Sequence, residues 1–248
     1  MVLEQFTRTK ILLGEQGLAL LAQSKVLLFG VGGVGSYTVE ALARTGVGQL
    51  VLVDYDQVEI TNINRQLPAL LSTLGRYKVD VLKERILDIN PEAEVTVYRE
   101  KVGPENVRIF FQENPSYVVD AIDMVTGKIA IIETALALGV PLVSAMGAGN
   151  RLDPAKIRLA DISETSGCPL ARIMRQELRK RGIRKGVKVV YSTEAPQKRW
   201  EDAAADAQDR RSPGSISFVP SVAGLFLAAQ VVRELVGRWI DDAGKENI

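Results

Sequence analysis

The stretch Val26-Leu27-Leu28-Phe29-Gly30-Val31-Gly32-Gly33-Val34-Gly35 sets a short apolar run directly before a cluster of glycines. The run 26–29 is typical of a buried strand, and residues 36–45 have helical spacing, so the glycines occupy a turn from a strand into a helix. Glycines let the backbone approach a phosphate there, and the helix offers unpaired N–H donors. The predicted phosphate-binding glycines are Gly30, Gly32, Gly33 and Gly35, a pattern shared by proteins that bind adenine nucleotides and dinucleotides.

Strands and helices alternate on both sides of this turn. Further strands are predicted at 50–53, 94–98, 117–122 and 141–144, and helices at 77–89, 104–112 and 128–138. Residues 11–22 suggest short helices interrupted by Gly14 and Gly17. The alternation predicts an α/β protein with a Rossmann-like, doubly wound and mainly parallel sheet, which binds ligands beyond the carboxyl ends of its strands.

The sequence becomes more polar and basic after Asn150. Here we expect a smaller α/β extension with strands at 157–162 and 187–193, a basic helix at 169–181, a mobile loop at 194–214 and an apolar helix at 218–236. Arg233 and Glu234 interrupt the apolar helix, which favours packing inside the protein over crossing a membrane. We therefore predict a nucleotide-binding region at 1–150 and an extension at 151–248 within the same domain.

Composition excludes several kinds of chemistry. The 248 residues include no histidine and one cysteine, Cys168, so the chain has no internal disulfide, no zinc site built from Cys and His, and no histidine base. Any metal must be bound by oxygen. The net charge of +1 argues against a wholly basic nucleic-acid binder but not against a local basic patch. The first residues contain no apolar run of signal-peptide length, which predicts a soluble cytoplasmic protein.

A polar stretch after the second strand favours ATP over NAD. Asp54 is placed to bind ribose hydroxyls, and Asp56, Asn62, Asn64, Arg65 and Gln66 follow it closely. A triphosphate needs such cationic and amide donors, whereas a dinucleotide does not. Lys78 at the start of the next helix can reach the same phosphates, or it can be a solvated helix charge. Asp123 can hold magnesium through oxygen, or it can cap the helix that follows it.

These motifs together resemble the ubiquitin-activating-enzyme-like superfamily of ThiF and MoeB, in the same order over residues 6–150. The matching groups are Gly30 to Gly35, Asp54-x-Asp56, Thr61-Asn62-x-Asn64-Arg65-Gln66, Lys78 and Asp120-Ala121-Ile122-Asp123. The resemblance implies an enzyme that activates a carboxylate with ATP. It also implies that Asp54 binds ribose, that Asn62, Arg65 and Lys78 contact the triphosphate, and that Asp123 is the magnesium ligand.

The amino-terminal Arg8, in Phe6-Thr7-Arg8-Thr9, matches the arginine with which this superfamily reaches into the ATP site of the neighbouring subunit. The resemblance therefore implies a homodimer and a catalytic set of Arg8, Arg65, Lys78 and Asp123. Sulfur-carrier activators of the superfamily carry two Cys-x-x-Cys pairs for zinc and a catalytic cysteine. Both pairs are absent here, which predicts no zinc and leaves Cys168 without an assigned role.

Other stretches are similar to the TcdA branch, whose members are tRNA threonylcarbamoyladenosine dehydratases. They include Ala41 to Gly46, Ile89-Asn90-Pro91, Gly147-Ala148-Gly149 and Tyr191-Ser192-Thr193-Glu194. This resemblance implies that ATP adenylates the threonine carboxylate of the modified adenosine in tRNA. Attack within the side chain then expels AMP and closes a ring. Whether a sulfur-relay protein docks on the surface is left open.

A basic cluster gives independent support for a tRNA partner. Eight cations and one acid, Glu177, fall within residues 172–188, enough to follow a phosphate backbone. The predicted tRNA contacts are Arg172, Arg175, Arg179, Lys180, Arg181, Arg184 and Lys185; the alternative is a solvated helix face.

Two other functions stay open from the sequence: an adenylyltransferase acting on the carboxyl terminus of a sulfur-carrier protein, and a nucleotide- or NAD-binding protein without adenylation. The missing zinc cysteines and the basic cluster disfavour the first of these. Asn62, Arg65 and Lys78 disfavour the second.

Overall fold

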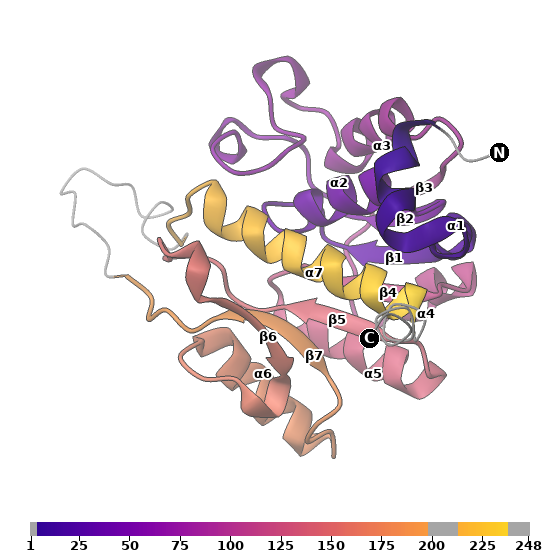
Figure 1. Ribbon diagram of the computed structural model, residues 1–248. Helices are drawn as coiled ribbons and strands as arrows, with labels where there is room; N and C mark the ends of the chain where they lie inside the picture. Colours follow the sequence, from indigo (N-terminus) through magenta and orange to yellow (C-terminus); the bar gives the residue numbers. More distant parts are fainter. Residues whose placement is uncertain (1–3, 198–212, 238–248) are drawn as a thin grey trace.

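The computed structural model describes residues 4–197 and 213–237, in which a seven-stranded sheet lies between two layers of helices (Figure 1). Every pair of neighbouring strands is parallel except β6 and β7. The strands in sheet order are β3 (Glu94–Tyr98), β2 (Gln49–Val53), β1 (Lys25–Phe29), β4 (Tyr117–Asp120), β5 (Leu142–Ala145), β7 (Lys188–Ser192) and β6 (Ile157–Asp161). This confirms the predicted Rossmann-like, mainly parallel sheet.

The helices cover both faces of the sheet because successive side chains of each strand point to opposite faces. In β1, Val26 and Leu28 belong to one apolar core, and Leu27 and Phe29 to the other. On the first face lie α1 (Thr7–Gln23), α2 (Gly35–Thr45), α3 (Lys78–Ile89) and α7 (Phe218–Val236). On the second face lie α4 (Val107–Phe110), α5 (Val125–Leu138) and α6 (Pro169–Lys180). Short 3-10 turns occur at Glu4–Phe6, Ile60–Asn62, Leu71–Thr73, Phe111–Glu113, Pro154–Lys156 and Ile162–Glu164.

The predicted elements differ from the structure mainly at their ends. The helix expected to be broken by glycines does break, at Gly14, whose φ of 69° is not helical, whereas Gly17 lies within the helix. The strand predicted at 117–122 ends at Asp120, because the Asp120 carboxylate accepts the N–H of Ile122 and turns the chain. The helix predicted to begin at residue 128 begins three residues earlier, at Val125.

The carboxyl-terminal part extends the same sheet. β7 pairs with β5, so the strands of the predicted extension continue the sheet of the first 150 residues. α7 crosses back to pack on α2, where Thr38 donates to the Gly224 carbonyl oxygen (3.0 Å). α7 is long and apolar enough to cross a membrane by composition, yet half of it is buried inside the molecule, as expected for a packing helix. The predicted mobile loop 194–214 lies mostly outside the described residues, and the division at residue 150 stays a prediction.

Candidate functional site

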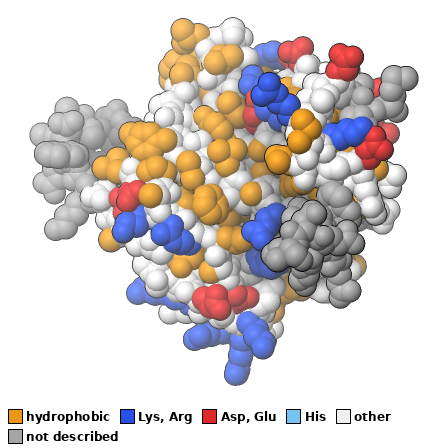
Figure 2. Space-filling model, viewed as in Figure 1, with side chains coloured by type: hydrophobic (Ala, Val, Ile, Leu, Met, Phe, Trp, Pro, Cys, Tyr) orange, Lys and Arg blue, Asp and Glu red, His pale blue; other side chains and the backbone are white. Residues whose placement is uncertain are grey.

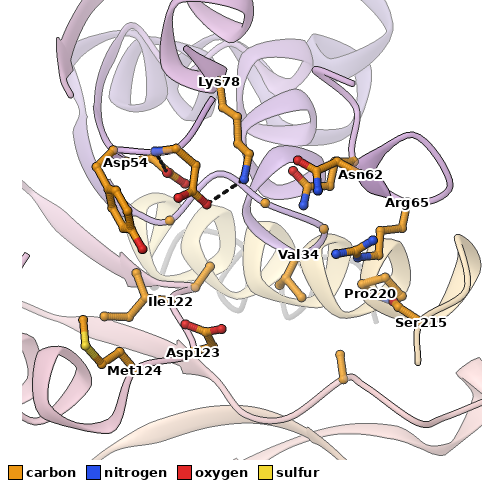
Figure 3. A pocket seen from close by; sticks show the side chains of 18 of the residues that line it. Val34, Asp54, Asn62, Arg65, Lys78, Ile122, Asp123, Met124, Ser215 and Pro220 are labelled. Atoms are coloured by element: carbon orange, nitrogen blue, oxygen red, sulfur yellow. Dashed lines mark hydrogen bonds and ion pairs between the residues drawn. The ribbon is translucent and has the colours of Figure 1, made fainter. Parts of the chain in front are cut away.

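A cavity of about 790 Å³ opens where the strand order reverses, between β1 and β4. The segments that follow β1, β2, β3, β4 and β5 line it, as expected for the carboxyl edge of a doubly wound sheet. Ten of the predicted site residues meet there: Gly30, Gly32, Gly33, Asp54, Asp56, Asn62, Arg65, Gln66, Lys78 and Asp123 (Figure 3).

The glycine loop is packed tightly against the turn after β4. Gly30 has a φ of +83°, and a Cβ atom there would lie 2.8 Å from the carbonyl oxygen of Ala121. Gly33 faces Arg65, since a Cβ atom on Gly33 would lie 3.5 Å from the Cγ of Arg65. The loop therefore presents bare backbone to the cavity and leads directly into α2. The positive end of the helix dipole favours an anion there, although the N–H of Ser36 already donates to the carbonyl oxygen of Gly32 (3.0 Å).

Asp54 joins the two loops that form the floor of the cavity. One carboxylate oxygen accepts the N–H of Val31 (2.8 Å), and the other accepts the N–H of Asp56 (2.9 Å). Burial raises the pKa of Asp54, and the two backbone donors only partly oppose this. The carboxylate thus fixes the glycine loop relative to the end of β2, beside the position expected for a ribose.

Lys78 is a buried residue of the cavity and not a solvated helix charge. Its side chain is 6% exposed, and its ammonium group lies 2.7 Å from a carboxylate oxygen of Asp56, as the dashed line in Figure 3 shows. Because the lysine is buried and its acidic partner is nearly half exposed, the positive charge is held at the cavity wall. A phosphate entering the cavity would compete with Asp56 for it.

The guanidinium group of Arg65 lies on the other side of the cavity, across from Asp123 in Figure 3. Its Nη1 donates to the carbonyl oxygen of Thr61 (2.8 Å) and to the side-chain oxygen of Asn64 (2.9 Å). Asn62 is buried and caps its own turn by accepting the N–H of Glu59 (3.2 Å). The side-chain oxygen of Gln66 is buried and has no hydrogen-bond partner among residues 4–197 and 213–237.

Asp123 is exposed to the cavity and does not cap α5, because Met124 occupies the N-cap position. Within the described ranges it forms no hydrogen bond or ion pair and belongs to no cluster of three or more acidic or cysteine side chains. Mg²⁺ in nucleotide sites is commonly held by one or two carboxylates together with phosphate oxygens and water. A single exposed carboxylate that lines the same cavity as Arg65 and Lys78 fits that kind of binding and not a closed metal site made of protein ligands.

Three predicted site residues do not line the cavity. Gly35 is buried where α2 meets β1, and a Cβ atom on it would overlap the carbonyl oxygen of Gly30. Asn64 is exposed; it donates to the carbonyl oxygen of Ser215 (3.0 Å) and accepts from Nη1 of Arg65 (2.9 Å), and both partners line the cavity. Arg8 is exposed in the first turn of α1. Gly35 and Asn64 therefore contact the glycine loop and Arg65 without lining the cavity themselves, and Arg8 is not among the lining residues.

The predicted tRNA contacts form a strip of mixed character along α6. Arg175 donates to Thr165, and both Lys180 and Arg181 pair with Glu177. In the described part of the chain, no acid pairs with the four other exposed cations, Arg172, Arg179, Arg184 and Lys185. The strip begins near the carboxyl edge of the sheet, where Cys168 lies beside Gly147, and ends at the amino edge, where β7 begins.

Several cavity residues escaped the sequence prediction. Lys101 follows β3, and the carboxyl-edge rule that identified Asp54 applies to it equally. Ser215 lies just before α7 and Pro220 lies in its first turn, far along the chain. Only the packing of α7 on α2 brings them to the cavity, so no local pattern could have indicated them.

The chain is similar to proteins of known activity over nearly its whole length. The model of the ThiF family matches residues 6–247. The tRNA threonylcarbamoyladenosine dehydratase of Bacillus subtilis (strain 168) is 46% identical over 243 residues, which are 95% of this chain and 96% of that protein. The crystal structure of E. coli tRNA N6-threonylcarbamoyladenosine dehydratase, TcdA, in complex with ATP has a TM-score of 0.84 and 35% identity, covering 98% of this chain and 97% of that one. The corresponding complex with AMP gives a TM-score of 0.85 and 36% identity, covering 98% and 96%.

Proposed function

The chain belongs to the ThiF family, and from that premise we propose that it is an ATP-dependent tRNA threonylcarbamoyladenosine dehydratase. The observation that carries the proposal is the convergence of Arg65, Lys78 and Asp123 on one cavity beside a glycine loop. Relatives of this activity match almost the full chain, and one of them binds ATP and AMP. These matches confirm the resemblance to the ThiF and MoeB superfamily and its TcdA branch that the motifs alone predicted.

The proposed reaction is adenylation followed by ring closure, as the names of the relatives imply, and the cavity geometry bears on the adenylation step. A carboxylate is a poor electrophile, so the threonine carboxylate first attacks the α-phosphate of ATP and releases pyrophosphate. A group within the same side chain then attacks the acyl carbon, loses its proton, expels AMP and closes the ring, so that water is formally lost. The protein has to align the two reactants and neutralise charge, which Arg65 and Lys78 can do without a histidine.

We propose Mg²⁺ as the metal and Asp123 as its protein ligand, with no zinc. When bound, the cation would neutralise charge on the phosphate oxygens. Asp54 holds the ribose, Asn62 and Gln66 face the phosphates, and the glycine loop receives them at the start of α2. Asn64 and Gly35 contribute by holding Arg65 and the loop in place.

A turnover assay separates this function from the two alternatives. Purified protein, ATP and MgCl₂ are incubated with threonylcarbamoyl-modified tRNA. The tRNA is then digested to nucleosides, whose masses are measured by mass spectrometry. A loss of about 18 Da, the mass of one water, with equal amounts of AMP and pyrophosphate is the expected result. An unchanged nucleoside would refute the dehydratase. If a sulfur-carrier protein supplied in place of the tRNA were adenylated, the result would support the adenylyltransferase. If the protein bound NAD but not ATP, the result would support a non-catalytic protein.

We propose a homodimer that pairs through α1 and α7. The two helices are in contact, and apolar side chains gather over α7 in the middle of the face in Figure 2. Ile11 and Leu12 on α1 are 78% and 82% exposed, and Leu225 and Phe226 on α7 are also exposed. An apolar area of this kind on a soluble protein commonly marks an interface. Arg8 lies three and four residues before Ile11 and Leu12, on the same face of α1, which would carry it into the partner subunit.

Mixing two inactive variants tests whether Arg8 acts in the partner's site. We expect Arg8→Ala and Asp123→Ala each to be inactive as a homodimer. After unfolding and refolding together, a mixed dimer has one intact site if Arg8 acts across the interface, so about a quarter of all sites should turn over. If Arg8 served its own subunit, both sites of every mixed dimer would be defective and the mixture would stay inactive. Mixing Asp123→Ala with itself is the control.

We propose that Arg172, Arg179, Arg184 and Lys185, the cations on α6 and just after it that pair with no acid among the described residues, bind the tRNA backbone. We also propose that the protein acts in the cytoplasm. Lys and Arg side chains gather at the lower edge of Figure 2, over α6. Replacing Arg184 and Lys185 together with alanine should flatten the slope of log affinity against log salt concentration by about one unit per lost phosphate contact. The double variant Lys83→Ala/Arg108→Ala removes the same charge elsewhere and should leave the slope unchanged. An equal slope in both variants would place the tRNA on another surface.

A further inference from the structure

A fully buried ion pair lies directly beneath the turn that carries Asp123. The ammonium of Lys128 is 2.9 Å from a carboxylate oxygen of Asp120, and both side chains are 0% exposed. The same carboxylate oxygen accepts the hydroxyl of Ser144 (2.6 Å), so the pair joins β4, β5 and α5. Burying two charges is costly, and replacing such a pair by apolar residues often leaves stability unchanged or improved. A contribution to the stability of the fold is therefore a weak explanation for the presence of this ion pair.

The two residues of the ion pair form hydrogen bonds with two backbone groups of the turn. Lys128 donates to the carbonyl oxygen of Ile122 (3.0 Å), and Asp120 accepts the N–H of Ile122 (3.3 Å). Both polar groups of the residue next to Asp123 are thus held by one network. The turn also meets the glycine loop, since a Cβ atom on Gly30 would clash with the carbonyl of Ala121 and the side chain of Ile122.

We propose that Lys128 is a positioning residue of the adenylation site, acting with Asp120 to hold the turn 121–123 so that the Asp123 carboxylate faces bound nucleotide and magnesium. The inference rests on the proposed function. Lys128 itself is buried beneath the turn and does not line the cavity, so it acts through Asp123 and not on the substrate. Groups that orient a metal ligand from behind commonly change metal affinity or activity by about 10- to 100-fold when removed.

The test separates positioning from folding by removing both charges at once. Lys128→Met alone leaves the Asp120 carboxylate buried without a counter-charge, so it is expected to destabilise the protein whatever its role. The double variant Lys128→Met/Asp120→Asn keeps the volumes and restores neutrality but leaves the Ile122 carbonyl unheld. Lys25→Met is the matched control, since Lys25 forms a partly exposed ion pair at the opposite end of β1.

Calorimetric titrations with ATP, with and without MgCl₂, supply a measurement that does not depend on turnover. We expect the double variant to melt close to the control and to keep its Mg²⁺-free affinity for ATP. It should lose most of the gain in affinity that Mg²⁺ gives the wild type, and its kcat should fall at least about 10-fold. Lys25→Met should retain both the gain in ATP affinity that Mg²⁺ gives and the wild-type kcat.

A double variant with wild-type Mg²⁺ dependence and kcat would overturn the proposal and leave the pair a structural element. A wild type whose ATP affinity ignores Mg²⁺ would overturn it as well. If the double variant fails to fold, Ser144→Ala replaces it as the test, because this variant removes one hydrogen bond to Asp120. It should raise the Mg²⁺ concentration needed for half-maximal rate or binding. An unchanged Mg²⁺ concentration would refute the proposal. Because the titrations need no tRNA, they judge this inference even where the wild type leaves the modified tRNA unchanged.

Discussion

Asp123→Ala is expected to lower the turnover number by at least about 10³-fold, because it removes the one carboxylate proposed to hold Mg²⁺ on the phosphates. Stability should change little, within about 0.5 kcal/mol, since the side chain is exposed and makes no hydrogen bond or ion pair with any residue that the structure describes. Single-turnover formation of AMP and thermal melting measure the two effects.

The exposed Asp88 on α3 provides the control, because Asp88→Ala removes the same charge away from the cavity. It should leave both turnover and melting unchanged. Turnover of Asp123→Ala within about 10-fold of the wild type would remove Asp123 from the proposed mechanism. A variant that melted far earlier than the control would instead indicate that the carboxylate stabilises the turn.

Gly35→Ala is expected to destabilise the fold by about 3 kcal/mol or more. Its Cβ atom would overlap the carbonyl oxygen of Gly30 and lie 3.3 Å from the Cβ of Ala121, so α2 would have to move away from β1 and from the turn after β4. Urea denaturation measures the loss. The reason is packing of the helix against the strand and not loss of a phosphate contact, since Gly35 does not line the cavity.

Gly139→Ala is the matched control for a glycine in open space. Gly139 has a φ of +67°, and a Cβ atom there would meet nothing within 4 Å, so only the strained backbone opposes it, at about 1 kcal/mol. If Gly35→Ala were no less stable than Gly139→Ala but bound ATP poorly, Gly35 would be a nucleotide contact, as the motif predicts.

The sheet was predictable because strand and helix periods differ and because glycines mark the first turn. Leu50 to Val53 is apolar throughout, as a strand covered on both faces must be, and Asp54 follows at the carboxyl edge. The order of strands and the antiparallel β6 depend on contacts between distant segments, which local patterns do not encode.

The candidate site was predictable only where its residues share a short motif. Asp54, Asn62 and Arg65 fall in one polar stretch, and Lys78 opens the next helix. Packing decides which residues of a motif line the cavity. Gly35 is packed against the carbonyl oxygen of Gly30 and Asn64 hydrogen-bonds Arg65 and Ser215, so both matched the motif without lining the cavity. Lys128 lies at a helical position among apolar residues, where nothing in the sequence distinguishes a buried ion pair from an ordinary surface lysine.

Helix α7 has a consequence for the order in which the protein matures on the ribosome. It supplies Pro220 to the cavity wall and is translated after every strand of the sheet, so the nucleotide site cannot be complete until Pro220 has been synthesised and α7 has packed on α2. Until then the apolar side chains of α2 and β5 that α7 covers are exposed on the nascent chain, a surface that chaperones recognise. Binding of ATP would then be the last step of folding, because ATP would stabilise only those chains in which α7 has already packed on the sheet.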